Sequence, residues 1–352
     1  MEQALEQFFA GLHWTLLGLV IVVALGVLGR GADWLVNEAV ALSERSGIPK
    51  VVIGATIVSL GTTTPEAAVS VLAAVRGSPG LALGNAVGSI ICDTGLILGL
   101  ACLIAPLRLN RRIVNRQGWI QFGAGVALVA ASFPWGRPSG VFIDGGRLPQ
   151  FMGFVFLGAL AAYLWRSVVW SRREPEVAEF EEHAVAAHEQ EAATSNIVIL
   201  GKLVAAIAVV VGSAKILIPA VEEAALRLDV PEGIVAATLV AFGTSLPELI
   251  TAVTAARRGH GDLAVGNVVG ADILNVLFVA GASAAVTRGG LEAGAHFFQV
   301  LFPIMLLILV VFRAGIFFSD EYLRRPFGYV LLGAYGVYLV VSYLLPGGPP
   351  AH

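Results

Sequence analysis

The chain has 352 residues, of which 57% are hydrophobic and only 13% are charged, whereas about a quarter of the residues of a soluble globular domain are charged. Together with a mean hydropathy of +0.82, this composition excludes a globular domain with a large core and indicates a protein that crosses a membrane several times. The net charge of −3 and the lack of a basic face with interleaved aromatic residues give no sign of nucleic-acid binding.

Ten apolar segments are long enough to span a bilayer, which takes about 20 residues. In chain order, we predict spanning helices over residues 14–42, 50–75, 79–105, 118–134, 150–170, 196–226, 232–256, 261–286, 295–313 and 326–345. The stretch before the first helix is acidic and lacks the basic start of a signal peptide, so we expect that helix to be retained. The first and sixth segments exceed the bilayer thickness, which predicts a strong tilt.

Basic residues in the short loops predict the orientation of the chain. If both termini face outward, the cytoplasmic loops hold 13 of these residues and the outer loops hold 5. The first group is Arg45, Lys50, Arg108, Arg111, Arg112, Arg116, Arg172, Arg173, Arg257, Arg258, Arg313, Arg324 and Arg325, and the second is Arg76, Arg137, Arg147, Arg227 and Arg288. The excess predicts that both termini lie outside.

One hydrophilic insert, RREPEVAEFEEHAVAAHEQEAATS at residues 172–195, separates the fifth and sixth predicted helices. Its simplest interpretation is an acidic, solvated tether on the cytoplasmic side. A second interpretation is a regulatory cation site made by its glutamates with His183 and His188. The insert divides the chain into a first unit at 1–172, a loop at 173–195 and a second unit at 196–352.

The two units contain an internal repeat with a constant offset of 182 residues. Residues 55–99 align with residues 237–281 without a gap and are identical at 20 of 45 positions, which indicates a duplication. Each unit has five spans, an odd number, so the second copy enters the membrane in the opposite orientation. We therefore predict an all-α polytopic membrane protein with ten transmembrane helices in two inverted five-helix repeats. Secondary transporters commonly have this architecture, with the substrate site near the midplane between the repeats.

The repeated strings GTTTPE, at residues 61–66, and GTSLPE, at residues 243–248, are unusual for membrane helices. In each string the proline lacks an N–H, so the glycine carbonyl four residues earlier loses its helical partner. In a membrane, such a break is tolerated where it faces protein or a wet cavity. The residues of the two predicted breaks are Gly61, Pro65, Gly243 and Pro247.

Each string also places a glutamate near the middle of its predicted helix. A lone charge at that depth costs at least about 3 kcal/mol, and two facing carboxylates repel each other, so a bound cation would relieve both problems. Thr62 lies four residues before Glu66 and thus on the same helical face, and Thr244 stands in the same relation to Glu248. Hydroxyl, carbonyl and carboxylate oxygens suit a hard cation such as calcium or sodium.

A polar stripe follows in the next helix of each repeat. Its members recur every four residues and are Asn85, Ser89 and Asp93 in the first repeat and Asn267, Ala271 and Asn275 in the second. The simplest role for Asn85 and Asn267 is a hydrogen bond between helices. The glycine pairs at 84 and 88 and at 266 and 270 allow close helix contact. Asp272 matches an isoleucine in the first repeat, which places it outside the symmetric site.

The strings GTTTPE with GNAVGSIICD, and GTSLPE with GNVVGADILN, resemble the two alpha-repeats of the calcium/cation antiporter superfamily, and above all those of prokaryotic sodium/calcium exchangers. The resemblance covers essentially the whole chain. It implies an antiporter, and not an enzyme, that exports calcium against entering sodium across the plasma (inner) membrane of a prokaryote. The transported cations and the lipid bilayer would be its partners, and it would need no cofactor. Helices 1 and 6 would slide across a fixed core to alternate access.

The resemblance also implies the ion ligands. Calcium would be held by Glu66 and Glu248 with the backbone carbonyls of Thr62 and Thr244. The positions that match the family's sodium sites are Ser59, Thr62, Thr63, Ser89, Asp93, Ala241, Thr244, Ser245 and Asn275. The sequence departs from the family twice. Close relatives commonly carry Asn in the first repeat and Asp in the second, which are exchanged here at 93 and 275, and the serine expected at Ala271 is missing.

Three other functions remain open at the level of sequence. Proton-coupled calcium export would use the same carboxylates, with Asp93 as a proton carrier. A cation channel with a glutamate ring is disfavoured because two broken helices without a pore-loop pattern are not typical of a channel. An intramembrane protease would need a Ser/His pair or paired aspartates, but the six histidines lie at ends or in loops, and no second aspartate pairs obviously with Asp93.

Overall fold

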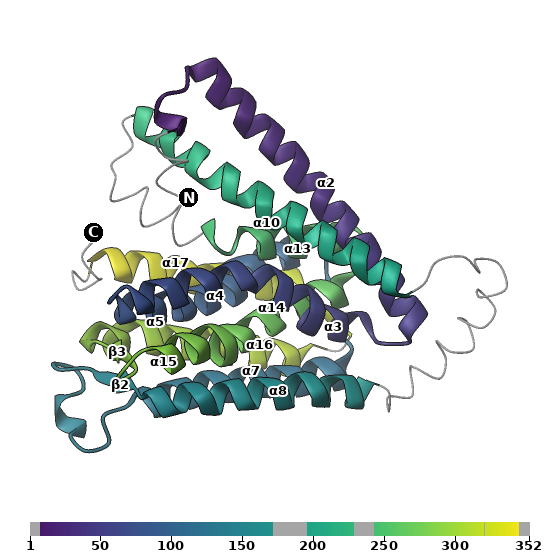
Figure 1. The fold of residues 1–352 in the computed structure, drawn as a ribbon. Helices are drawn as coiled ribbons and strands as arrows, with labels where there is room; N and C mark the ends of the chain where they lie inside the picture. Colours follow the sequence, from purple (N-terminus) through teal and green to yellow (C-terminus); the bar gives the residue numbers. More distant parts are fainter. Residues whose placement is uncertain (1–7, 172–195, 229–242, 320, 345–352) are drawn as a thin grey trace.

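The computed structural model of the protein describes residues 8–171, 196–228, 243–319 and 321–344, which are almost entirely helical (Figure 1). By length and composition alone, six helical stretches among these residues can cross a membrane. They are Trp14–Ser46, Lys50–Val75, Pro79–Ile104, Ile197–Arg227, Gly261–Val286 and Phe297–Phe318.

The first half of the chain supplies the elements up to α8. They are α2 (Trp14–Ser46), α3 (Lys50–Ile53), the π-helical turn η1 (Gly54–Val58), α4 (Ser59–Val75), α5 (Pro79–Ile91), the π-helical turn η2 (Cys92–Ile97), α6 (Leu98–Ile104), β1 (Leu107–Arg108), α7 (Arg111–Ser132), the 3₁₀ turn η3 (Pro138–Gly140), β2 (Gly146–Leu148) and α8 (Gln150–Ser171). Helix α7 begins at Arg111, rather than at residue 118 as predicted, because the Asn110 side chain caps it by accepting a hydrogen bond from the Ile113 N–H.

The second half supplies the remaining elements. They are α10 (Asn196–Arg227), α13 (Leu246–Arg257), α14 (Gly261–Leu274), the π-helical turn η5 (Asn275–Ala280), α15 (Gly281–Val286), β3 (Leu291–Ala293), the π-helical turn η6 (Phe297–Leu301), α16 (Phe302–Phe318), β4 (Tyr322–Leu323) and α17 (Arg325–Leu344). The hydrophilic loop at 173–195 and the predicted seventh helix before residue 243 lie outside the described residues.

The helix boundaries recur with the offset of the sequence repeat. Helices α2 and α10 begin at residues 14 and 196, α5 and α14 begin at 79 and 261, and α6 and α15 end at 104 and 286. The duplication seen in the sequence is therefore also a duplication of helical elements.

Two short antiparallel strand pairs link the halves in a way that shows how they are related. Strand β1 precedes α7 and pairs with β4, which follows α16. Strand β2 follows α7 and pairs with β3, which precedes α16. If the two halves are exchanged, β1 takes the place of β3 and β4 takes the place of β2, so one strand pair becomes the other. The two pairs lie at opposite ends of α7. A two-fold axis in the membrane plane produces this pattern, as expected for inverted repeats.

The irregular backbone of the first motif lies one turn earlier than predicted. Instead of a break at Gly61 and Pro65, helix α4 runs through both residues, and the departure from α-helical geometry is the π-helical turn η1. Pro65 still offers no N–H to the Gly61 carbonyl. In the second repeat, α13 begins at Leu246, so Pro247 lies in the first turn, where a missing N–H leaves no helical bond unmade.

A side chain from α8 stabilises the turn η1. The Tyr163 hydroxyl donates a hydrogen bond of 3.0 Å to the Ala55 carbonyl, and both residues are buried. A π-turn interrupts regular helical pairing, and an unpaired carbonyl is costly in hydrocarbon. Tyr163 gives the Ala55 carbonyl a side-chain donor at the turn that leads directly into Ser59 and the first motif.

Helices α2 and α10 lie side by side and cross the other helices obliquely (Figure 1). They contain 33 and 32 residues, so each is about 50 Å long at ~1.5 Å per residue, which exceeds the hydrocarbon thickness of about 30 Å. At their crossing, a Cβ on Gly31 would lie 2.9 Å from Cγ1 of Val209. A glycine at this position therefore allows the two helices to touch.

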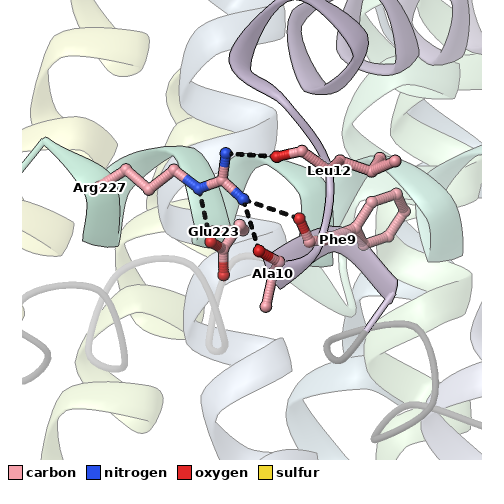
Figure 2. A network of polar contacts seen from close by, with 5 residues as sticks. All are labelled: Phe9, Ala10, Leu12, Glu223 and Arg227. Carbon is pink, nitrogen blue, oxygen red and sulfur yellow. Dashed lines mark hydrogen bonds and ion pairs between the residues drawn. The ribbon is translucent and has the colours of Figure 1, made fainter.

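Arg227, at the end of α10, ties this helix pair together (Figure 2). Its guanidinium donates to the carbonyls of Phe9 and Leu12, each at 2.8 Å, and to that of Ala10 at 3.1 Å. Its Nε lies 2.6 Å from Oε1 of Glu223. Because residues 9–12 lead into α2, these contacts join α2 and α10 beyond their shared apolar packing.

An ion pair connects α2 to the end of α13. Asp33 Oδ1 lies 2.7 Å from Nη2 of Arg258, and Arg258 Nη1 also donates to the Asn37 side chain. Both side chains of the pair are partly exposed, so its contribution to stability is about 0–1 kcal/mol. The positions 182 residues away from Arg258 and Asp33 hold Arg76 and Lys215. These carry like charges, so this link has no symmetric counterpart.

Helix α14 lies at the centre of the bundle and is buried along nearly its whole length. A Cβ on Gly266 would lie 2.2 Å from the Val51 carbonyl oxygen, and one on Gly270 would lie 2.4 Å from Cα of Ala55. The close contact predicted for this glycine pair is confirmed, and its partners are α3 and η1. For the matching pair, Gly84 and Gly88, the equivalent partners fall at 233–237, outside the described residues.

We expect Gly270→Ala to destabilise the protein, because the new methyl group would meet backbone atoms that cannot move without shifting η1. Overpacking of this kind typically costs about 1–3 kcal/mol, which should lower the melting temperature in detergent by several degrees. Gly123→Ala is the matched control, since a Cβ there meets nothing within 4 Å. Equal melting temperatures for the two variants would contradict the close packing of α14 on η1.

Candidate functional site

The two motif glutamates lie inside the helix bundle. Glu66 is on α4 and Glu248 is on α13, and each is 1% exposed. Their charges, with that of Asp93 on η2, lie close enough to repel one another. Repulsion of this kind is strong in a low-dielectric interior. Ionised carboxylates in this arrangement need a bound cation.

A hydrogen bond joins the two motifs across the repeats. Thr63 on α4 donates to Oε1 of Glu248 at 3.1 Å. The sequence places Thr62, and not Thr63, on the same helical face as Glu66. It does not predict which residues of the two repeats meet. In the structure, Thr62 donates to the Ser59 carbonyl of its own helix at 3.3 Å. Thr62 and Thr63 of the first motif therefore both lie beside the Glu248 carboxylate of the second.

Several oxygens around the glutamates are buried and have no hydrogen-bond partner among the described residues. They are both carboxylate oxygens of Glu66, Oε2 of Glu248, Oδ1 of Asp93, Oδ1 of Asn275 and the hydroxyls of Ser89, Thr244 and Ser245. Buried polar atoms in folded proteins are normally paired. Carboxylate, amide and hydroxyl oxygens are the donors that hard cations such as calcium and sodium prefer.

Asp93 and Asn275 face each other between the repeats. Asn275 Nδ2 lies 3.4 Å from Oδ2 of Asp93, and both side chains are 1% exposed. They belong to η2 and η5, the equivalent π-helical turns of the two halves. Their positions differ by 182 residues, so they are the same position of the repeat. The pair therefore contains one carboxylate and one amide, and this would remain so if the two residues were exchanged between the repeats.

The two stripe asparagines bond between helices, as expected. Asn85 Nδ2 donates to the Ser70 hydroxyl at 2.9 Å, linking α5 to α4. Asn267 Nδ2 lies 3.5 Å from the Glu248 carbonyl oxygen, linking α14 to α13. Each asparagine therefore positions the helix that carries a motif glutamate.

The motif glycines both lie against α10. A Cβ on Gly61 would be 2.5 Å from Cδ1 of Ile207, and one on Gly243 would be 3.0 Å from Cγ2 of Ile218. At both positions, glycine allows a close approach of α10 to the glutamates. Of the other predicted site residues, Ser59 donates to the carbonyl of Thr56 in its own helical segment, and Ala241 lies outside the described residues.

Asp272, which the sequence places outside the symmetric site, is a buried carboxylate next to η2. It is 2% exposed, and its Oδ2 accepts hydrogen bonds from Thr94, the neighbour of Asp93, and from Gln121 on α7. No second aspartate pairs obviously with Asp93 in the sequence, but the structure brings Asp272 close to it, beside Thr94. The sequence did contain a sign of this contact. Asp272 and Thr94 are polar residues in apolar helices, and the residues that match them in the other repeat, Ile90 and Val276, are apolar.

Among the described residues, no three His, Cys, Asp or Glu side chains gather as a metal cluster. A cation at the glutamates would thus be held by two carboxylates with hydroxyl and carbonyl oxygens, a weak set compared with a permanent metal site. Weak, multi-oxygen coordination is suited to an ion that must also leave.

Comparison with known proteins agrees with this geometry. The sodium/calcium exchanger protein family matches residues 16–169 and 198–344. The sodium/calcium exchanger MaX1 of Methanosarcina acetivorans is 29% identical, over 93% of this chain and 98% of its own. The inner membrane protein YrbG of Escherichia coli is 30% identical, over 93% of this chain and 96% of its own.

A solved structure of the sodium-calcium exchanger NCX_Mj, soaked with neither sodium nor calcium, superimposes with a TM-score of 0.73 at 25% identity. The superposition covers 94% of this chain and 99% of that one. The predicted fold class is confirmed: the protein is an all-α membrane protein built from two inverted five-helix repeats. It is a membrane transporter and not an enzyme, and it belongs to the sodium/calcium exchanger family.

Proposed function

We propose that this protein is a secondary antiporter that exports calcium in exchange for entering sodium by alternating access. The observation that carries the proposal is the pair of buried glutamates, Glu66 and Glu248, one from each inverted repeat, surrounded by unpaired oxygens. A divalent cation balances two carboxylates, whereas an empty pair leaves two repelling charges in a dry interior. When calcium leaves the two carboxylates, another cation has to take its place. The protein therefore exchanges one cation for another.

In this proposal calcium binds between the two carboxylates, with the carbonyl oxygens of Thr62 and Thr244 completing the site. Sodium ions use the remaining oxygens, from Ser59, Thr62, Thr63, Ser89, Thr244, Ser245, Asp93 and Asn275 and from the carbonyl of Ala241. Thr62 and Thr244 belong to both ligand sets, so calcium and sodium compete for this region and are not carried together. The resemblance to the exchanger MaX1 supports sodium as the counter-ion.

Proton-coupled calcium export is the second candidate, and the Asp93–Asn275 pair is the observation that favours it. The pair places a third buried carboxylate beside the glutamates, and Ala271 lacks the hydroxyl of its repeat partner Ser89. The missing hydroxyl removes one sodium ligand, and Asp93 offers a group able to carry a proton. We favour sodium because the threonine and serine hydroxyls around both glutamates would otherwise have no role.

Calcium uptake into proteoliposomes tests the coupling ion. Vesicles loaded with sodium and diluted into sodium-free medium should take up labelled calcium, because the outward sodium gradient drives calcium inward. A pH gradient without sodium should drive little uptake. Strong pH-driven uptake in sodium-free vesicles would replace sodium by protons in the proposal, and no uptake under any gradient would reject calcium transport.

We further propose that both termini face outward, on the basis of the 13 to 5 distribution of basic residues in the loops. Ser139, in the turn between α7 and α8, and Glu321, between α16 and α17, are both exposed and lie on opposite sides of the membrane in this orientation. In intact cells, an impermeant thiol reagent should label Ser139→Cys quickly and spare Glu321→Cys. The reverse pattern would invert the topology.

A further inference from the structure

Asp272 has no place in the ion site described above, although it is a carboxylate in the most buried helix of the protein. Its side chain is 2% exposed. The Thr94 hydroxyl donates to its Oδ2, and Gln121 Nε2 lies 2.5 Å from the same oxygen. Gln121 Nε2 also lies 3.1 Å from the Thr94 hydroxyl. The three side chains form a closed triangle that joins α14, η2 and α7, which we call the Asp272 triad.

The triad lies directly beside the Asp93–Asn275 contact. Thr94 follows Asp93 in η2, and Asp272 precedes Asn275 by three residues, about one helical turn. The second repeat therefore holds η2 at two successive residues, through Asn275 at Asp93 and through Asp272 at Thr94. Because η2 is a π-helical turn, its backbone lacks the regular hydrogen bonds of an α-helix. Side-chain contacts are therefore more important for holding Asp93 in place.

The triad exists on only one side of the pseudo-two-fold axis. The residues that match Asp272 and Thr94 in the other repeat are Ile90 and Val276. The Asp93–Asn275 pair maps onto itself under the repeat, whereas the triad does not. The added polar contacts hold the turn that carries the carboxylate of the pair, and not the turn that carries the amide.

We propose that Asp272, through Thr94, is a positioning residue for Asp93 and so determines the affinity for the coupling ion. This inference rests on the proposed function, because it assigns Asp93 to the coupling ion. An ion ligand held by a polar partner keeps its orientation between binding events, and loss of such partners commonly lowers ion affinity roughly 10–100-fold. The hydrogen bonds of Asp272, Thr94 and Gln121 do not reach Glu66 or Glu248, so we expect calcium affinity to change little.

Two pairs of variants separate positioning from packing. Thr94→Val keeps the shape of the side chain and removes the hydroxyl, and it copies the residue of the other repeat; Thr94→Ser keeps the hydroxyl. Asp272→Asn keeps the shape and removes one acceptor. Ser283→Ala is the matched control, since it removes a buried hydroxyl on α15 that has no partner among the described side chains.

In proteoliposomes, the KM for the ion that drives the wild-type protein should rise about tenfold in Thr94→Val and Asp272→Asn. The calcium KM in calcium–calcium exchange should stay within about twofold of wild type, well below the range given above for a lost ligand partner. Thr94→Ser and Ser283→Ala should behave as wild type. If Thr94→Ser is as impaired as Thr94→Val, or if neither Thr94→Val nor Asp272→Asn changes the KM for the driving ion, the positioning role is wrong.

A structure of Thr94→Val gives a second readout that needs no transport. In the wild type, Asn275 Nδ2 lies 3.4 Å from Asp93 Oδ2, and we expect this contact to be lost in the variant. An unchanged contact would overturn the inference even if the protein exports calcium as proposed. Conversely, a wild-type protein that moves no calcium under any gradient would reject the proposed function, while this structural result would still decide the role of the triad.

Discussion

Glu66→Gln and Glu248→Gln should each abolish calcium transport while the protein still folds in the membrane. Glutamine keeps the size and most of the hydrogen-bonding capacity of the side chain but removes half of the charge offered to calcium. Removing one partner from a buried ionic contact costs about 3–5 kcal/mol, which corresponds to more than a hundredfold in affinity. Glu248→Gln also changes the acceptor of the Thr63 hydroxyl, so we expect it to be at least as severe.

The same variants, although unable to transport calcium, should not be less stable than the wild type when calcium is absent. In the wild type, Glu66 and Glu248 are both buried, and their ionised forms repel each other. Neutralising either one removes this repulsion, so the melting temperature without ions should not fall. Added calcium should raise the melting temperature of the wild type, since a ligand stabilises the state that binds it, and should not raise that of either variant.

Glu292→Gln is the control for these measurements, because Glu292 lies on the surface and pairs only loosely with Arg147, at 3.4 Å. It should transport calcium and respond to it as the wild type does. Calcium exchange at wild-type rates in both glutamate variants would show that the site has been assigned to the wrong residues.

Asp93→Asn should leave calcium–calcium exchange largely intact and change the dependence of transport on the driving ion. The substitution removes the only carboxylate of the Asp93–Asn275 pair, whereas the two calcium glutamates remain. With sodium coupling, the sodium KM should rise strongly; with proton coupling, the response to a pH gradient should disappear. Measuring uptake under each gradient in wild type and variant distinguishes the two.

The exchange of both residues, Asp93→Asn with Asn275→Asp, should restore substantial transport. The two side chains are in contact and occupy equivalent positions of the repeats, so the pair again holds one carboxylate and one amide. Recovery should be incomplete, because the Asp272 triad holds the turn of Asp93 and has no counterpart beside Asn275. A double variant as inactive as Asp93→Asn alone would contradict the shared-carboxylate interpretation.

Much of the fold follows from the sequence because membrane burial leaves clear marks. Apolar length sets the helices, and the 182-residue repeat sets their relation; the helix starts at Lys50, Pro79 and Gly261 fall where predicted. The glutamates stand out because a carboxylate in the middle of an apolar helix demands an explanation. Their convergence follows from the inverted repeat, which brings equivalent midplane positions together.

Other features depend on contacts that no local pattern records. The π-helical turn η1 is stabilised by Tyr163 from a helix about 100 residues away along the chain, so the motif alone wrongly placed the irregular backbone at Pro65. The bond from Thr63 to Glu248 depends on how α4 meets α13. Asp272 was missed because reasoning from symmetry discards residues without a polar counterpart, and the triad is asymmetric.

The position of a bound divalent cation tests the central claim most directly. Strontium can stand in for calcium and has a strong anomalous signal, so crystals of the protein soaked in strontium without sodium would locate the ion. We predict one strong anomalous peak between the carboxylates of Glu66 and Glu248, which is lost in Glu66→Gln crystals soaked in the same way. A peak at another position, or an undiminished peak in the variant, would contradict a cation site shared by the two repeats.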